Sequence, residues 1–482
     1  MSRFFSLFPS IMLPMFLAMV DGTIVSAALP TIAGELGEAQ RISWIVIAYL
    51  IAATVASPVY GRLGDAFGRK RLMYLALAVV IVATVLCGFA PDVDLLIAAR
   101  VLQGLGAGGL MTLAQALIGE AVPPRERARY QGFLASVAVF ANAFGAVIGG
   151  LLTEHLGWRS IFFVSAPVGL LAMLLLLRLP AQVPKREPFR FDAGGLVLFV
   201  VFITSTLLMF REVQDFSATV VLPALGLLAL AVAAGILLVW RERRASSPLF
   251  PIALFHNPTI WRSDALTLFH GAALVSVITF LPIYLRVGLD WSPGAIGVSL
   301  LPLTISVPAG SILTGIAVSR TGRTAIFPSV GLIVATAVMV AVGVLLPYLS
   351  GLQLSFLLGF AGLFMGTVMG VVQVTVQSAA GPAMLGTAAA SVQFSRSIGA
   401  ALGTALVGVV LFATMTAVDP EAGHTLAAIL NEGADALSSM SPERVAAIEA
   451  GIGTAFRAAF FTVAGFVGAA MLLAWSVPLR RI

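Results

Sequence analysis

The sequence predicts an all-α, polytopic membrane protein, from two features of its composition and patterning. The chain has 482 residues, of which 59% are hydrophobic and only 10% are charged, whereas soluble proteins carry about 25% charged residues. Apolar runs of about 20 residues recur along the whole length, and each can cross the ~30 Å hydrocarbon core as a helix. The alternating segments of about 10 residues that are typical of membrane β-barrels do not occur.

The apolar runs define fourteen predicted transmembrane helices, and an even number places both ends of the sequence on one side of the membrane. The predicted spans are 7–30, 43–60, 72–90, 94–118, 130–152, 160–178, 192–210, 218–240, 263–286, 294–317, 325–347, 352–377, 384–413 and 455–477.

Basic residues identify that side. With both termini in the cytoplasm, 20 of the 28 Lys and Arg residues lie in or beside cytoplasmic segments, as the positive-inside rule expects. Arginine outnumbers lysine 26 to 2, which is typical of a GC-rich bacterial genome. We therefore expect a multi-pass protein of the bacterial cytoplasmic (inner) membrane with both termini cytoplasmic.

The composition also argues against several classes of function. The single cysteine, Cys87, excludes an intramolecular disulfide and a multi-cysteine metal site. The net charge of +6 follows from the topology, so no nucleic-acid partner is expected. The sequence has no cluster of His, Asp and Glu, no nucleophile elbow and no P-loop, so neither an enzyme nor a metal site is predicted.

An internal repeat at an offset of 254 residues indicates two homologous halves. Parallel repeats of this kind are a transporter architecture, with the substrate site between the halves. The first six spans then match the last six, and two spans are inserted between them. The matching pairs are Gly61 and Gly315, Asp65 and Ser319, Gly68 and Gly322, Arg69 and Arg323, Gly132 and Gly386, Phe140 and Phe394, Gly145 and Gly399, Ala146 and Ala400, and Gly149 and Gly403.

The motifs resemble those of the major facilitator superfamily, and within it the fourteen-span drug:proton antiporter family. The resemblance covers essentially the whole chain. It is carried by "GRLGDAFGRKRL" (61–72), "DGTIVSAALPTI" (21–32), "WIVIAYLIA" (44–52), "RVLQGLGAGG" (100–109) and "FDAGG" (191–195). It implies a six-helix half at 1–184, two inserted helices at 185–248, and a second six-helix half at 249–482 with a long outer loop at 414–454.

The fifth-helix antiporter motif departs from the family pattern. In "ANAFGAVIGG" (141–150), Ala141 stands where the family has its first glycine and Ala146 where it has a proline. The departure puts the antiport assignment, rather than the fold, in question. Gly145, Gly149 and Gly150 remain, and with Gly399 and Gly403 they form small-residue faces whose default role is close helix packing. In a major facilitator fold the same faces let the two halves rock.

The motif at 61–72, here called the loop motif, combines glycines, an acid and bases. Gly61 and Gly68 permit a tight turn and close helix approach. Arg69 and Lys70 can bind lipid phosphates and set the topology, and Asp65 can accept hydrogen bonds from a helix N-terminus. The resemblance implies a gate that holds the halves together on the cytoplasmic side. The alternative is a topology anchor alone, for which Asp65 would be superfluous.

Asp21 is the only acid well inside a predicted span, and an intramembrane charge is by default functional. Asp21 and Arg100 are both expected about 20 Å from the inner face at ~1.5 Å per residue, so they can pair. The resemblance implicates both in proton coupling. The alternative is a static ion pair that orders two helices. His270 could also carry protons, although a lone histidine on an apolar helix is more often only hydrogen-bonded.

Polar side chains within the spans are predicted to line a substrate cavity. Arg396 is either such a charge or a structural cation bonded to backbone carbonyls. Some of the glutamine and asparagine side chains in the spans are expected only to join helices by hydrogen bonds. These amide side chains are Gln103, Gln115, Asn142, Gln373, Gln377 and Gln393.

The sequence thus predicts a proton-coupled exporter of hydrophobic small molecules. Its energy source would be the proton gradient, without a cofactor. Its partners would be small-molecule substrates, protons and membrane lipids, and we expect a monomer, with a periplasmic adaptor left open. The spans are too poor in polar residues for a sugar or amino-acid cavity, but a symporter or facilitator of a small metabolite remains the alternative.

Overall fold

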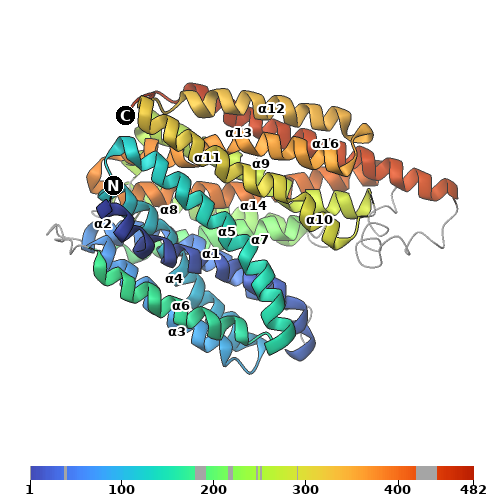
Figure 1. Cartoon of the computed structure of the whole chain (residues 1–482). Coiled ribbons are helices and arrows are strands. Elements are labelled where there is room, and N and C mark those ends of the chain that lie inside the picture. Colours follow the sequence, from blue (N-terminus) through green and yellow to red (C-terminus); the bar gives the residue numbers. More distant parts are fainter. Residues whose placement is uncertain are drawn as a thin grey trace. The chain divides into compact units, whose positions relative to one another are not determined.

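The computed structural model describes residues 2–36, 41–179, 191–214, 221–245, 248–249, 252–289, 291–418 and 442–482. Within these ranges the regular elements are helices, and the β-structure is limited to one isolated bridge between Arg323 and Arg481 (Figure 1). The all-α prediction is confirmed. Residues 419–441 of the predicted outer loop and residues 185–190 of the predicted inserted segment lie outside the described residues.

The first half of the chain forms six long helices. They are α1 (Ser2–Leu36), α2 (Trp44–Phe67), α3 (Arg69–Gly88), α4 (Val93–Ala121), α5 (Pro124–Leu156) and α6 (Ser160–Leu175), followed by the short 3-10 helix η1 (Leu176–Arg178).

The remaining helices follow the predicted order. They are α7 (Ala193–Gln214), α8 (Val221–Glu242), α9 (Pro258–Val287), α10 (Pro293–Ser299), α11 (Leu301–Thr321), α12 (Ile326–Leu345), α13 (Gly351–Ala380), α14 (Leu385–Val418) and α16 (Pro442–Ser476), with the 3-10 helices η3 (Ile252–His256), η4 (Leu346–Tyr348) and η5 (Pro382–Met384).

Thirteen helices in the described part of the chain are long and apolar enough to span a membrane. They coincide with thirteen of the fourteen predicted spans. The remaining predicted span, 130–152, lies within the 33-residue helix α5. The predicted outer loop at 414–454 is shorter than expected, because α14 continues to Val418 and α16 already begins at Pro442.

The helices form two compact units. Unit 1 comprises Met1–Ser205, Leu230–Ile260 and Gln373–Phe394, and unit 2 comprises Thr206–Ala229, Trp261–Val372 and Ser395–Ile482. The division passes through α13 and α14, because the end of α13 and the start of α14 pack with the first helices of the chain. The predicted boundaries at residues 184 and 249 therefore follow the repeat, whereas the compact units follow packing.

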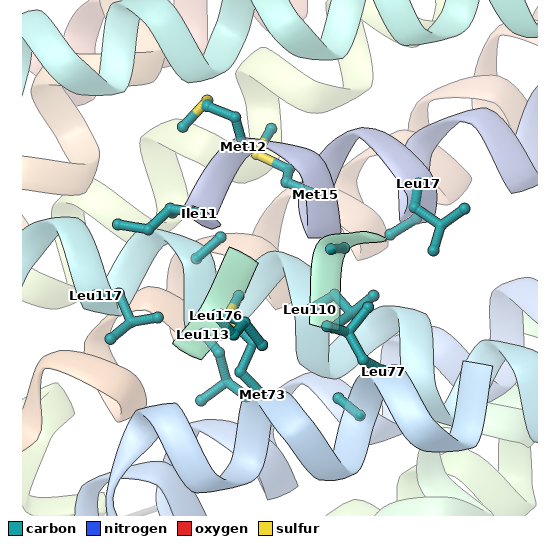
Figure 2. Close-up of a cluster of buried hydrophobic side chains, with 14 of the residues drawn as sticks. Ile11, Met12, Met15, Leu17, Met73, Leu77, Leu110, Leu113, Leu117 and Leu176 are labelled. Carbon is teal, nitrogen blue, oxygen red and sulfur yellow. The ribbon is translucent and has the colours of Figure 1, made fainter. Parts of the chain in front are cut away.

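Helix α4 lies at the centre of unit 1. In its most apolar 18-residue stretch 78% of the residues are buried, against 11% in α8, so α4 is an interior helix and α8 exposes most of its surface. Asp92 starts α4, since its carboxylate accepts a hydrogen bond from the Leu95 N–H at 2.8 Å. Apolar side chains of α1, α3, α4 and η1 fill the space around it, as Figure 2 shows for Ile11, Leu77 and Leu110.

Glycines on α4 allow α2 to approach it closely. A Cβ at Gly104 would lie 2.4 Å from the Tyr49 carbonyl oxygen, and one at Gly108 would lie 2.1 Å from that of Ala53. Any larger residue at either position would therefore force the two helices apart. Both glycines belong to the motif at 100–109 and stand four residues apart, on one face of α4. The motif alone does not identify them as the contact with α2.

We expect Gly108→Ala to destabilise the protein by about 1–3 kcal/mol, because the added methyl group overpacks the α2–α4 contact. Thermal unfolding of the purified protein in detergent would measure this as a lower midpoint. Gly465→Ala in α16 is the control, since a Cβ there meets no described atom within 4 Å. It should leave the midpoint unchanged or raise it. Equal midpoints for the two variants would contradict the packing role of Gly108.

Candidate functional site

A buried polar cluster joins α1, α2, α3 and α4 in the interior of unit 1. Asp21 on α1 is 1% exposed, and Arg100 and Gln103 on α4 are fully buried. Unpaired charges at such a depth are costly in a membrane, so their partners decide whether the cluster is stable.

Gln103 connects the two charges. Its side-chain Nε2 donates to Asp21 Oδ2 at 3.0 Å and to Thr84 Oγ1 at 2.8 Å, and its Oε1 accepts from Arg100 Nη1 at 2.6 Å. The side chains of Asp21 and Arg100 do not form a direct ion pair among those of the described residues. The depth argument correctly brought Asp21 and Arg100 together, but an amide bridges them. Gln103 is thus placed in this cluster rather than in an open cavity.

Arg100 is held from several sides. Its Nε donates to the Ile45 carbonyl at 3.2 Å, its Nη1 reaches the Asp21 carbonyl at 3.4 Å, and its guanidinium carbon lies 4.0 Å from the centroid of the Tyr49 ring. The Tyr49 hydroxyl donates to the Ala18 carbonyl at 2.8 Å. Arg100 Nη2 is a buried donor without a hydrogen-bond partner in the described part of the chain, so the guanidinium has one donor to offer if the cluster rearranges.

The loop motif builds a second cluster at the ends of α2 and α14, inside unit 1. Asp65 Oδ1 accepts from the Gly386 N–H at 2.8 Å, and Oδ2 accepts from the Thr387 N–H at 2.8 Å and the Thr387 hydroxyl at 2.9 Å. The carboxylate therefore caps the first turn of α14 from another helix, where the helix dipole favours a negative charge. This is the contact with a helix N-terminus that the sequence analysis considered.

Arg69 makes the same cluster a charge network. Its Nη2 contacts Asp65 Oδ1 at 2.6 Å, and its Nη1 contacts Glu120 Oε2 on α4, also at 2.6 Å. Lys70 donates to the carbonyls of Leu177 and Leu179. The basic side chains of the motif thus bind protein groups, and the sequence analysis did not anticipate Glu120.

The motif glycines are explained by close contact and by backbone conformation. A Cβ at Gly61 would lie 2.6 Å from the Gly386 carbonyl oxygen, so only glycine lets α2 meet α14 here. Gly68 has a φ of +98° between α2 and α3, a conformation that L side chains rarely adopt. Its repeat partner, Gly322, has a φ of +67° between α11 and α12.

The predicted packing glycines behave differently from one another. A Cβ at Gly145 or Gly149 would lie 2.0 Å or 2.7 Å from atoms of Thr23 or Ile24 on α1. On α14, one at Gly399 or Gly403 would lie 2.0 Å or 2.4 Å from carbonyl oxygens of α9. A Cβ at Gly150 would meet no described atom within 4 Å, so the packing contact expected there is absent from the described part of the chain.

His270 belongs to unit 2, whereas the Asp21 cluster belongs to unit 1. Its Nε2–H donates to the Met365 carbonyl at 3.0 Å, and its side chain is 2% exposed. The adjacent Gly271 packs against the backbone of Arg396, whose side chain is half-buried. This hydrogen bond favours the structural alternative for His270.

The predicted cavity glutamines include one that joins two helices and several with buried amide atoms that lack a partner among the described residues. Gln377 Nε2 donates to the Gln115 carbonyl at 3.1 Å. Three buried amide atoms, Gln115 Oε1, Gln373 Nε2 and Gln377 Oε1, have no hydrogen-bond partner in the described part of the chain. Gln393 is half-buried, and the side chain of Asn142 lies outside the described residues.

Two further acids are buried but are not evident from the hydropathy pattern: Glu242 at the end of α8, which is 4% exposed, and Asp264. Asp264 near the start of α9 is 4% exposed. It stands one residue inside the predicted span 263–286, so the hydropathy boundary placed it at a membrane edge rather than in the interior.

Residues 11–404 match the profile described as Major Facilitator Superfamily. The chain belongs to this family. An uncharacterized MFS-type transporter of Mycobacterium tuberculosis is 35% identical over 408 residues, which cover 83% of this chain and 58% of that protein. The multidrug transporter protein MdtP of Bacillus subtilis is 30% identical over 407 residues, which cover 84% of this chain and 75% of that protein.

The solved structures agree on the fold. The proton:xylose symporter XylE superposes with a TM-score of 0.62 at 15% identity, covering 99% of this chain and 96% of that chain. The human organic anion transporter MFSD10 superposes with a TM-score of 0.62 at 16% identity, covering 97% of this chain and 99% of that chain. The predicted major facilitator fold is confirmed, and the long apolar helices of the described residues are those of a multi-pass membrane protein.

We expect Gln103→Leu to destabilise the protein by about 1–2 kcal/mol, since buried interhelical hydrogen bonds in membranes are worth up to about 1.7 kcal/mol each. The variant leaves both charges of the cluster without their amide bridge. Thermal unfolding in detergent measures the effect, and Gln373→Leu is the matched control, because its buried Nε2 has no partner to lose. A larger loss for the control would contradict the bridging role.

Proposed function

We propose that this transporter exports hydrophobic small molecules across the bacterial cytoplasmic membrane in exchange for protons, by alternating access. One observation carries the proposal: the buried carboxylate of Asp21 is linked to Arg100 through the side-chain amide of Gln103. A relative from Fusarium, 31% identical over 342 residues, is named an MFS-type efflux pump, and this name supports the direction of transport. The chain spans 58% of the length of the mycobacterial relative, so activity and substrates belong to the proposal.

The proton step acts on the Gln103 bridge. An ionised Asp21 accepts the hydrogen bond from Gln103 Nε2. A protonated Asp21 carries its own donor, so the amide no longer gains a charge-assisted bond there. Gln103 Nε2 then keeps only Thr84 Oγ1 as a strong acceptor, and in this proposal the amide turns, so that Arg100 loses the oxygen that accepts from its Nη1. Protonation thereby becomes a change in the contacts between α1 and α4.

The Asp65 cap supplies the gate in this proposal. Three donors at the start of α14 depend on one carboxylate, so the contact is made or lost as a unit. Its release would let α14 move away from α2. Gly61 and Gly386 make room for the closed arrangement.

The substrate and the setting complete the proposal. The partnerless amide atoms of Gln115, Gln373 and Gln377, within otherwise apolar helices, suit a hydrophobic compound with a few hydrogen-bonding groups. The proton gradient supplies the energy, and no cofactor is required. We propose a monomer with both termini cytoplasmic, and a periplasmic adaptor is a partner to be tested.

A proton symporter or a facilitator of a small metabolite is the second candidate. Ala141 and Ala146 favour it, since they replace the glycine and proline of the antiporter motif on α5. The sign of proton movement decides between the candidates. In an antiporter, protons should move in the direction opposite to the substrate. In a symporter they should move in the same direction, and in a facilitator no protons should move with the substrate.

We expect Asp21→Asn to leave the protein folded but to abolish proton-coupled transport, because the amide side chain cannot ionise. The assay uses proteoliposomes with an imposed pH gradient, a panel of lipophilic dyes and drugs, and a fluorescent pH probe inside. Asp94→Asn is the control, since Asp94 is an exposed acid paired with Arg41 at the edge of the fold. Unchanged proton movement in Asp21→Asn would contradict a role of Asp21 in proton coupling.

We expect Asp65→Asn to slow transport roughly tenfold or more, because it weakens charge-assisted bonds worth about 1.5–3 kcal/mol each. Initial efflux rates from proteoliposomes, normalised to protein content, measure this. Thr387→Val is the matched variant, since it removes the hydroxyl donor and keeps both N–H groups. It should have the smaller effect; equal effects would mean that the carboxylate charge is not what matters.

A further inference from the structure

A cavity of about 260 Å³ lies in unit 2 beside the turn between α11 and α12. Pockets for drug-sized ligands measure about 300–1,000 Å³, so this one suits a smaller group. It belongs to neither cluster described above. Its lining includes Arg323, Ile326, Ser329, Trp475, Arg480 and Arg481.

The last residues of the sequence build one wall of the cavity. The Thr324 N–H donates to the Arg480 carbonyl and the Ile482 N–H donates to the Gly322 carbonyl, both at 2.9 Å. These bonds form an antiparallel bridge between Arg323 and Arg481. Two arginines from distant parts of the sequence are thus held at one site by the backbone.

Three arginines line the cavity without an Asp or Glu partner among the described residues. The sequence has no Asp or Glu in residues 291–418 or 450–482. In the described part of the chain, no Asp or Glu side chain forms an ion pair with Arg323, Arg480 or Arg481. The N-terminal turn of α12, which borders the cavity at Ile326, has neither a capping side chain nor an acid, so its dipole adds to the positive field.

The internal repeat shows how the charge became uncompensated. Arg323 occupies the position that matches Arg69, and Arg69 is paired with Asp65 and Glu120. In the second copy, Ser319 stands at the position of Asp65, and its hydroxyl donates to a carbonyl of its own helix. The motif arginine is retained, while the acid that neutralises its counterpart is missing.

An exposed apolar surface continues from the cavity. Ile326, Val330 and Ile333 on α12 are 45%, 48% and 43% exposed, and Leu472 and Trp475 on α16 are 67% and 48% exposed. Their spacings place each set on one helix face, and α12 packs against α16. A membrane would cover this surface with acyl chains, and three of these residues also line the cavity. The arginines of the cavity and the apolar face beside them therefore suit one amphiphilic molecule.

We propose that this cavity binds the phosphate group of an anionic phospholipid, whose acyl chains lie along the α12 and α16 faces. The arginines and the α12 N-terminus hold the phosphate, and Trp475 lies at the boundary between headgroup and chains, a common position for tryptophan. The lipid thereby ties the last residues of the sequence and the α11–α12 turn to the membrane surface. The proposal does not depend on the direction of transport.

Trp475 provides the readout. The other tryptophans are replaced by phenylalanine, and the full chain is reconstituted in phosphatidylcholine vesicles containing a small fraction of brominated phosphatidylglycerol or, separately, brominated phosphatidylcholine. Bromine quenches tryptophan fluorescence at contact distance. Brominated phosphatidylglycerol should quench Trp475 more strongly at equal fraction, and added salt should reduce the excess. Equal quenching by the two lipids would overturn the proposal.

Arginine variants locate the site. Arg323→Gln and Arg481→Gln should each weaken the apparent affinity for brominated phosphatidylglycerol about fivefold, which corresponds to about 1 kcal/mol per arginine. Arg320→Gln is the control, because Arg320 lies in the last turn of α11 but does not line the cavity. An equal loss of affinity in the control would refute a specific site. If an arginine variant fails to fold, the salt dependence of quenching in the protein with its arginines intact still tests the proposal.

Inorganic phosphate distinguishes a lipid from a free anion. If the cavity takes the phosphate of a lipid, inorganic phosphate should reduce the excess quenching no more than an equal ionic strength of chloride does. Complete displacement by inorganic phosphate at matched ionic strength would assign the cavity to a soluble anion instead and overturn the lipid assignment.

Discussion

Charges buried within a membrane protein must find their partners inside the protein, because lipid offers none. This constraint organises unit 1. Arg100 uses two backbone carbonyls, an amide oxygen and an aromatic face, which together involve α1, α2 and α4. Asp21 uses the same amide. The helices that supply these groups cannot shift independently, because each would break hydrogen bonds of the cluster.

Close helix approach is the second requirement of this arrangement. Arg100 can reach the Ile45 carbonyl only if α2 lies directly against α4, and Gly104 and Gly108 allow that separation. Likewise, Asp65 can cap α14 only because Gly61 and Gly386 let α2 and α14 meet at their backbones. In both places a residue without a side chain positions a residue with a charge, so glycines far from any ligand are part of the functional geometry.

The two copies of the internal repeat have kept the same backbone turn but carry different charges. Gly68 and Gly322 both adopt positive φ between consecutive helices. In the first copy the acid faces another helix end and the arginine is neutralised within the protein. In the second, serine replaces the acid and the arginine joins two others beside a cavity. The same backbone turn therefore supports a helix–helix contact in the first copy and an arginine-lined cavity in the second.

The sequence by itself determined the fold class, the order of the helices, the family and the residue types at the two clusters. These follow from local properties: apolar length, charge asymmetry, and motifs such as the one at 61–72. Depth along two helices was enough to bring Asp21 and Arg100 to the same level.

Only the tertiary structure decided which atoms meet. Residue spacing measures distance along a helix but not rotation about its axis, so it could not show that Gln103, rather than a direct ion pair, joins Asp21 to Arg100. Nor could it show that Glu120 completes the Asp65 network, that Gly150 lacks a packing partner, or that His270 binds a backbone carbonyl. The arginine cavity is the extreme case, since its two walls lie more than a hundred residues apart and meet through backbone hydrogen bonds that no side-chain pattern records.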